Sequence, residues 1–335
     1  MSSRDTSSNH DAAGMTPVHL GIMLPTVGRV ATGESVAAVA RHAERAGATT
    51  LWVSDHFTMP VAQRTKLPHG QATYPVPVDR DYLEAFTTLA WAAAQTQRAE
   101  LGTAVCVAPY RSPIMLAKAV GTLSLLTGRQ FNLGVGSGWL KEEFAALDVD
   151  FGARHRLTDE AIDFVRACPA SDGVVALAGR AASEPVDMYI RPYPPETMRV
   201  WIGGSGPKAR KRASVRGDVW FPDLHGCSPA QARAGMAEIA GLAAQAGRPA
   251  DAVRLAVFME IHIGETMRPE PWLHGQQVYG SAGFVLDVVN QYRASGMAEL
   301  VLAFGGGATH RQDSLDRLLS AGLADALATE RYQRA

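Results

Sequence analysis

The fold of this chain is decided by the stretch Thr50-Leu51-Trp52-Val53-Ser54-Asp55-His56, a short apolar strand that ends on an acid and an imidazole. An amphipathic helical pattern over residues 35–47 precedes it and stops at a glycine, as in a βα chain. In parallel α/β proteins the chemistry gathers at the carboxyl ends of strands. Asp55 and His56 are therefore candidates for moving a proton or orienting a cofactor; the alternative is a partly buried histidine held by its neighbour.

The same alternation of apolar strand, short turn and amphipathic helix continues along most of the chain. It predicts eight strands with helices between them, which is the number that closes a (β/α)8 TIM barrel. We therefore expect an α/β fold in which residues 17–335 form one barrel domain. The predicted strands cover residues 19–24, 50–54, 101–105, 131–135, 199–202, 218–221, 254–263 and 299–304.

Several segments break the alternation. Long insertion loops are expected at about 57–80, 168–197 and 264–280, the second of them with a hairpin. The first loop is rich in proline and is expected to cover the substrate as a lid that excludes water. Residues 1–16 are polar and lack the apolar region of a secretory signal, so they predict a disordered tail.

Composition narrows the function classes. The formal net charge is −1, which gives no reason to expect nucleic acid or a membrane surface as a partner. No apolar run approaches the roughly 18 residues of a membrane span. The 3 cysteines show no CxxC spacing, so neither a disulfide framework nor a metal site is expected. These features predict a cytoplasmic protein that acts on a small molecule.

Two glycine-rich turns follow predicted strands. The segment 134–139 begins like a dinucleotide fingerprint but has Trp139 in place of the third glycine, so it is either a tight βα turn or a ligand contact. In the segment 202–207, the glycines leave a strand and Pro207 suits the first turn of a helix. Backbone N–H groups at such a helix start favour phosphate binding over a plain turn.

These motifs, in this order, resemble the luciferase-like flavin-dependent oxidoreductase superfamily over about residues 18–325. The resemblance is carried by residues 51–57, 101–103, 133–139 and 201–207. Members bind either FMN or the deazaflavin coenzyme F-420, and an Asp-His pair after the second strand is most similar to the F-420 branch.

The resemblance implies a role for each motif. Asp55 and His56 would lie beside the ring of the cofactor, with His56 as proton donor or acceptor and Asp55 orienting the imidazole or the ring. Ala104 and Val105 would be joined by a non-prolyl cis peptide that backs the ring. The ring pocket would be lined by Ser137 and Gly138.

The resemblance also implies a phosphate site. It would be formed by Gly203, Gly204, Ser205, Gly206, Pro207 and Lys208. Arg154-His155 takes the place where some FMN relatives carry an Arg-Tyr pair that touches the phosphate.

The implied activity is hydride transfer between coenzyme F-420 and a small organic substrate, in a homodimer. F-420-dependent sugar-phosphate dehydrogenases carry a glutamate where this chain has Trp139, which speaks against that reaction here. One alternative is an FMN-dependent monooxygenase that receives reduced flavin from a flavin reductase and uses oxygen. A further alternative is a non-catalytic flavin-binding barrel.

Overall fold

The structure is a computed structural model that describes residues 17–66, 81–177, 186–222, 227–264 and 277–327. The tail expected over residues 1–16 lies outside these ranges. So do most of the insertion expected at 57–80, part of the second and most of the third.

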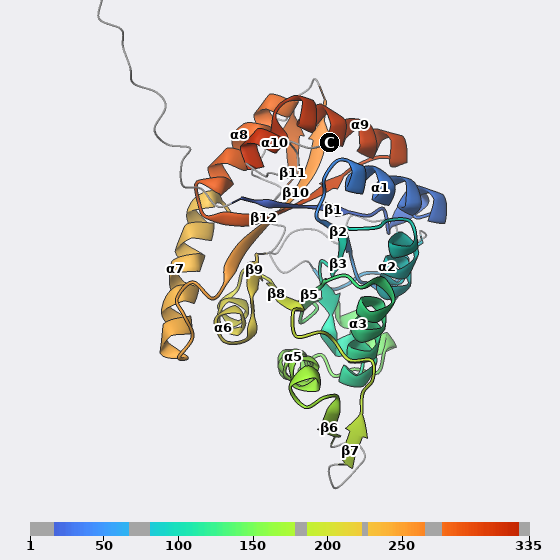
Figure 1. Cartoon of the computed structure of the whole chain (residues 1–335), viewed down its shortest axis with the longest axis vertical. Helices are drawn as coiled ribbons and strands as arrows, with labels where there is room; N and C mark the ends of the chain where they lie inside the picture. Colours follow the sequence, from blue (N-terminus) through green and yellow to red (C-terminus); the bar gives the residue numbers. More distant parts are fainter. Residues whose placement is uncertain (1–16, 67–80, 178–185, 223–226, 265–276, 328–335) are drawn as a thin grey trace, which may run out of the picture.

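Eight parallel strands pair in a closed ring, which confirms the predicted TIM barrel (Figure 1). Strand β1 pairs with β2 and β12, and β10 pairs with both β9 and β12, so the sheet has no gap. The barrel strands are β1 (His19–Met23), β2 (Thr50–Val53), β3 (Glu100–Thr103), β5 (Phe131–Gly136), β8 (Arg199–Gly203), β9 (Val219–Phe221), β10 (Arg254–Ile263) and β12 (Met297–Phe304).

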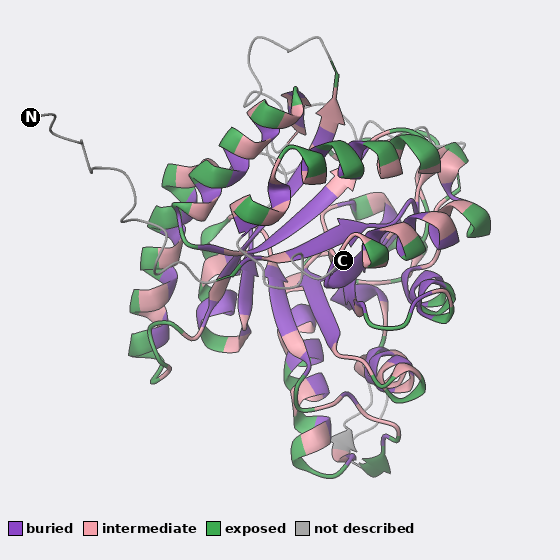
Figure 2. Cartoon of the chain, turned by 45° about the horizontal axis from the view of Figure 1, so that its top comes forward, coloured by how far each residue is buried: buried purple, intermediate pink, exposed green. Residues whose placement is uncertain are grey.

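Helices form a layer around the strands, with their exposed faces outward and their buried faces on the sheet (Figure 2). Serine caps begin three of them, at Ser112, Ser228 and Ser281, each accepting a hydrogen bond from the backbone three residues on. The helices are α1 (Gly33–Arg45), α2 (Ala85–Ala94), α3 (Pro113–Thr127), α4 (Lys141–Ala146), α5 (Arg154–Ala170), α6 (Pro207–Arg216), α7 (Pro229–Gln245), α8 (Ala282–Arg293), α9 (Ala308–Ser320) and α10 (Leu323–Leu327), with 3-10 turns η1 (Gly28–Val30) and η2 (Ala108–Tyr110).

Smaller elements decorate the barrel. Strands β6 (Val174–Leu177) and β7 (Val186–Tyr189) pair antiparallel, which confirms the hairpin predicted in this region. Two further strands were not predicted: β4 (Cys106–Val107) pairs with β5, and β11 (Gln277–Gly280) pairs with β10. Helix α4 was also missed, because six residues are too few to show a helical period.

Large side chains fill the interior of the barrel. Trp52 and Trp201 meet there with ring centroids 4.4 Å apart, and Phe221 packs against both. A Cβ atom on Gly21 or Gly102 would lie 2.1 Å or 2.4 Å from the Trp52 ring, so only glycine fits at those positions. Because the centre is packed, a ligand site on the barrel axis has to lie at one of its ends.

Candidate functional site

Asp55 and His56 both follow the end of β2 at Val53, and their side chains bond to different groups. Both oxygens of the Asp55 carboxylate accept hydrogen bonds from Arg111, at 2.6 and 2.8 Å, and one also accepts the Val107 N–H at 2.9 Å. The expectation that Asp55 orients the imidazole is therefore wrong.

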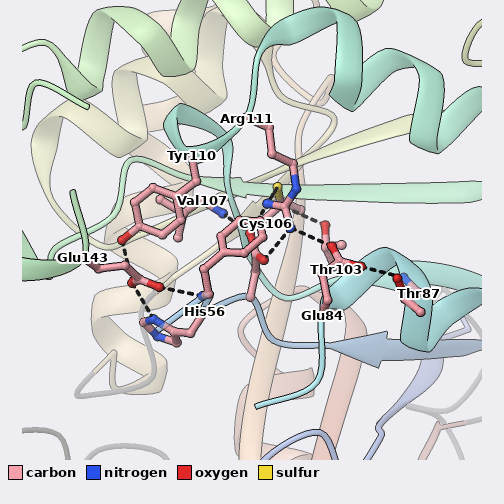
Figure 3. A network of polar contacts seen from close by, with 12 residues as sticks. His56, Glu84, Thr87, Thr103, Cys106, Val107, Tyr110, Arg111 and Glu143 are labelled. Carbon is pink, nitrogen blue, oxygen red and sulfur yellow. Dashed lines mark hydrogen bonds and ion pairs between the residues drawn. The ribbon is translucent and has the colours of Figure 1, made fainter. Parts of the chain in front are cut away.

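The carboxylate that holds His56 belongs to Glu143, in α4. His56 Nδ1 lies 2.8 Å from Glu143 Oε2, and Tyr110 donates its hydroxyl to the same oxygen at 2.7 Å (Figure 3). The Glu143 side chain has no exposed surface. Burial acts to raise the pKa of Glu143, but the hydrogen bonds from His56, Tyr110 and the Phe57 N–H outweigh it and hold that pKa below its usual value.

Helix α4 also fixes the chain that follows His56. Glu143 Oε1 accepts the N–H groups of Phe57 and Thr58 at 2.6 and 3.1 Å. Glu142 accepts the N–H groups of Arg64 and Thr65 at 2.6 and 2.8 Å. Burial slightly opposes ionisation of Glu142, yet these bonds and the Thr65 hydroxyl lower its pKa to about 2. Two adjacent glutamates thus clasp the start of the loop beside the imidazole.

Arg111 forms a separate part of the network, above and to the right of Tyr110 in Figure 3, away from Glu143. Besides its paired contact with Asp55, it donates to Glu84 Oε1 at 2.9 Å, and its guanidinium lies 4.5 Å from the centre of the Phe57 ring. Burial would lower the pKa of Arg111, but Asp55 and Glu84 raise it above its ordinary value. Asp55 therefore anchors the end of β2 to η2 and α2, which is a positioning role.

Aromatic rings border His56. Its imidazole meets Trp139 edge-on at 6.3 Å and Tyr82 edge-on at 5.8 Å, measured between ring centroids. Trp139 thus stands beside the imidazole, and the carboxylate that touches His56 reaches it from α4 instead.

Small residues form the surface next to these groups. The peptide between Ala104 and Val105 is cis, as the resemblance implied. A Cβ on Gly136 or Gly203 would lie 2.8 or 3.0 Å from the Val105 side chain. Gly134 likewise has no room, because its Cβ would lie 1.9 Å from the Thr103 carbonyl oxygen. Close packing against Thr103 and Val105 therefore accounts for Gly134, Gly136 and Gly203.

The start of α6 has the features of an anion site. Gly204 has a φ of +108°, which favours glycine, and Gly206 is an extended N-cap with no side-chain cap. A Cβ on Gly206 would meet nothing within 4 Å, so the approach to the first turn is open. The helix dipole and the first-turn N–H groups favour an anion there.

Cations and Ser137 gather near this helix start. His155 Nδ1 lies 3.1 Å from Ser137 Oγ. Burial lowers the pKa of His155, and the positive charges of Arg154, Lys208 and Arg212 lower it further. The structure thus brings Ser137, His155 and Lys208 together from three separate motifs. This concentration of positive charge around an uncapped helix start fits the phosphate of a flavin-type cofactor.

Arg154 and Arg212 contribute charge while their side chains are held by protein groups. The Arg154 guanidinium stacks on Phe151 at 3.9 Å and donates to the Phe151 carbonyl at 2.9 Å. Arg212 donates to Asp159 at 2.6 Å and to the His155 carbonyl at 3.1 Å. Lys208 is exposed at the first turn of α6.

Residues 14–270 match the family model described as luciferase-like monooxygenase, so the chain belongs to the luciferase-like monooxygenase family. None of the helices within the described ranges has the length and apolar character needed to cross a membrane.

Relatives of this chain include an uncharacterized protein of Mycobacterium tuberculosis, 26% identical over 79% of this chain and 83% of that protein. An F420-dependent glucose-6-phosphate dehydrogenase of Amycolatopsis mediterranei is 31% identical over 52% of this chain and 49% of its own length. Among solved structures, an F420-dependent secondary alcohol dehydrogenase shares the fold with a TM-score of 0.74 and 15% identity, covering 92% of this chain and 99% of the other. The chain is thus an enzyme of the flavin- and deazaflavin-dependent oxidoreductases.

Three residues of the site escaped the sequence patterns: Glu143, Tyr110 and Arg111. Glu143 lies 87 positions after His56, and nothing local in its short helix marks it as a partner of an imidazole. The available signal was positional, because α4 directly follows β5 and so begins at the same end of the barrel as His56.

Proposed function

We propose that this protein transfers a hydride between coenzyme F-420 and a small organic substrate at the mouth formed by the carboxyl ends of β2, β3, β5 and β8. Family membership supports oxidoreductase chemistry, and the similarity to an F420-dependent glucose-6-phosphate dehydrogenase supports the deazaflavin.

The residues present fit such a cofactor in two places. Its phosphate would be held at the start of α6 by Gly203 to Lys208, with Ser137 and His155 beside it. Its ring would lie over the small residues Ala104, Val105 and Gly138, close to His56. When bound, a deazaflavin supplies the hydride transfer; the protein positions it and excludes competing reactions.

His56 would move the proton that accompanies the hydride. With Nδ1 directed at Glu143, the opposite ring nitrogen, Nε2, is the one that can exchange a proton with a substrate oxygen. The ionised, fully buried Glu143 fixes the orientation of the ring. A base oriented by a buried carboxylate in this way is typical of general acid–base catalysis.

The single observation that carries this proposal is the 2.8 Å contact between His56 Nδ1 and a carboxylate with no exposed surface, at the end of a barrel strand. Such a contact holds the imidazole in one orientation, which proton transfer at a defined place requires.

An FMN-dependent monooxygenase is the second candidate, and one observation favours it. Trp139 stands at the edge of His56, at the position where F-420-dependent sugar-phosphate dehydrogenases carry an acid. Trp139 cannot donate a proton as that acid does. In that case the protein would depend on a flavin reductase for reduced FMN.

Equilibrium titration with oxidised and reduced forms of coenzyme F-420 and FMN separates the two candidates. We expect the dissociation constant for F-420 to be at least tenfold lower than that for FMN. Oxygen consumption is then measured with reduced FMN and a reductase present. Tight binding of reduced FMN with stoichiometric oxygen uptake would replace the hydride-transfer proposal with the monooxygenase.

A further inference from the structure

A second cluster of polar side chains stands at the same end of the barrel, on strands that the cofactor site does not use. Along β10 the apolar residues Ala256 and Phe258 point into the barrel, so by alternation Glu260 and His262 point toward the mouth. Strand β11 lies beside β10 (Figure 1). The register places Gln277 next to Glu260 and Tyr279 next to His262.

These four side chains form one connected wall. His262 Nε2 lies 3.1 Å from Glu260 Oε1, and Gln277 donates to Glu260 Oε2 at 2.9 Å. Tyr279 donates to Gln277 at 3.2 Å, and its ring stacks on the His262 imidazole at 4.4 Å with an angle of 9°. Every member is held by another, so the wall keeps its shape without a ligand.

Arg311, in the first turn of α9, completes the cluster. Its Nε donates to the Gly306 carbonyl at 3.0 Å. Within the described part of the chain, that is its one hydrogen bond, and its two terminal nitrogens donate none. No ion pair within 4.0 Å joins it to a described carboxylate. Burial lowers the pKa of Arg311, and the charge of Glu260 opposes that effect.

Among the described residues of this cluster, the side chain with unused hydrogen-bond donors is therefore the cation Arg311. Both Glu260 oxygens already accept hydrogen bonds, whereas the fork of Arg311 has donors to spare. The side chains of Glu260 and His262 are 36% and 30% exposed, so a ligand at the mouth can reach them. A planar guanidinium with spare donors matches the two oxygens of a carboxylate or phosphate.

We infer, resting on the proposed function, that Arg311 and the β10–β11 wall form the site that recognises one end of the substrate, which we call the recognition pole. The substrate then carries an anionic oxygen group, a carboxylate or a phosphate. Glu260 and His262 then sit beside that anion as acceptor and donor for a neighbouring hydroxyl. The pole lies across the mouth from His56, so a short substrate would be held at one end and react at the other.

The wall also explains a glycine. A Cβ on Gly305 would lie 3.1 Å from His262 Cε1 and 3.2 Å from Nδ1, so the absence of a side chain there leaves room for the imidazole. The imidazole is thereby fixed between Tyr279 and the β12–α9 turn, which keeps Glu260 in place facing Arg311.

Calorimetric titration of the cofactor-free protein tests this pole directly. The probes are glycolate, methyl phosphate and the uncharged ethylene glycol, and the proteins are wild type, Arg311→Gln and Arg317→Gln. Arg317 is an exposed arginine of the same helix, so its substitution removes the same charge from the same element. We expect at least one anionic probe to bind at a site separate from the start of α6, and Arg311→Gln to weaken that binding at least tenfold while Arg317→Gln changes it less than twofold.

Glu260→Gln supplies a test with the opposite sign. Removing the carboxylate should strengthen anion binding several-fold, because the charge that opposes the anion is gone while its shape stays. An Arg311-dependent component with glycolate alone assigns a carboxylic acid, and one with methyl phosphate alone assigns a phosphate ester. Equal anion affinity in Arg311→Gln and wild type, with both proteins folded, would overturn the inference.

This outcome is independent of the cofactor. Failure of F-420 to bind would remove the proposed hydride transfer and leave the anion titration unchanged. Conversely, Arg311→Gln should bind F-420 as wild type does, since it lies away from the α6 phosphate site.

Discussion

Both ends of this barrel hold charged side chains, but the two clusters are built differently. At the amino ends of the strands, Arg199 donates to Glu100, Asn132 and Glu299 at 2.8, 2.9 and 3.1 Å, and Arg254 adds a second contact to Glu299. At the carboxyl ends, the buried Glu143 gathers its bonds from Tyr110, from backbone N–H groups and from His56, a group that can titrate.

The difference separates stability from chemistry. The cluster at the amino ends joins β3, β5, β8, β10 and β12 through arginines, which do not give up protons. The cluster at the carboxyl ends holds the imidazole of His56. Barrels in general keep catalysis at the carboxyl ends and stability at the amino ends, and the predictions below test that division.

The largest effect is expected at His56. His56→Asn should lower the rate of the cofactor half-reaction by about 100- to 10,000-fold, because the proton carrier is removed. Cofactor affinity should change less than threefold, since the phosphate site is separate. Stopped-flow reduction or oxidation of bound cofactor measures the rate. A normal rate in the variant would make His56 a structural residue.

Glu143→Gln is the matched test of the carboxylate. It keeps the size of the side chain but replaces the charged acceptor that orients the imidazole with a neutral amide, so we expect the rate of the cofactor half-reaction to fall by about 10- to 100-fold. Asp55→Asn should leave the pH profile unchanged and lower thermal stability, because Asp55 pairs with Arg111.

At the amino ends of the strands, we expect substitutions to lower the free energy of unfolding without changing the affinity for the cofactor. Arg199→Met leaves Glu100 and the buried Glu299 without their shared partner, which should cost about 3 kcal/mol of unfolding free energy. Arg156→Met removes an exposed pair with Glu160 and should cost less than about 0.5 kcal/mol. Denaturant unfolding gives both values. A cofactor dissociation constant altered tenfold by Arg199→Met would break the division between the two ends.

The same cluster predicts a pH dependence. Burial raises the pKa of Glu299 from 4.5 to about 7, in spite of Arg254 and Arg199. The folded state therefore binds the extra proton between these values, so this contribution to stability is complete below pH 4.5 and is lost as the pH rises through 7. Relative to wild type, Glu299→Gln should gain stability between pH 5 and 8, by up to about 3 kcal/mol. Parallel stability curves would contradict this.

The smallest effect concerns His155. Burial and three cations lower its pKa, and a bound anion would raise that pKa again. Binding should thus take up a proton, and the affinity for inorganic sulfate should rise a few-fold as the pH falls from 8 to 6. In His155→Asn this rise should be smaller. Titration calorimetry in buffers of different ionisation enthalpy counts the proton; no uptake in wild type would refute the link.

The sequence predicted the barrel because each of the eight barrel strands has its own local signal. Alternating side chains such as Leu20 and Ile22, facing the helices, and helix caps such as Ser112 appear within a few residues of each other. Strand β11 was missed because it is four residues long and follows a segment with no period. The predicted 101–105 strand ends at Thr103, its last two residues form the cis peptide, and β4 follows them.

The site was predictable only where its residues sit in motifs. Asp55 and His56 are adjacent in sequence, and that adjacency suggested a pair, although their side chains bond to different groups. The true partner, Glu143, depends on how β2 and β5 are placed around the ring. Such a contact follows from closure of the barrel, which no local pattern encodes. The wall of Glu260 and His262 went unnoticed for the same reason.

The most direct measurement of the central claim, that the carboxyl end of the barrel holds the cofactor, uses Gly206 at the start of α6. Asp and Asn are both good N-caps, and the site has room for either, so both variants should fold as stably as wild type. Titration with coenzyme F-420 should then show an affinity at least 30-fold lower for Gly206→Asp than for Gly206→Asn, because both side chains can cap the first turn but only the carboxylate repels the phosphate. Equal affinities for the two variants would contradict the account.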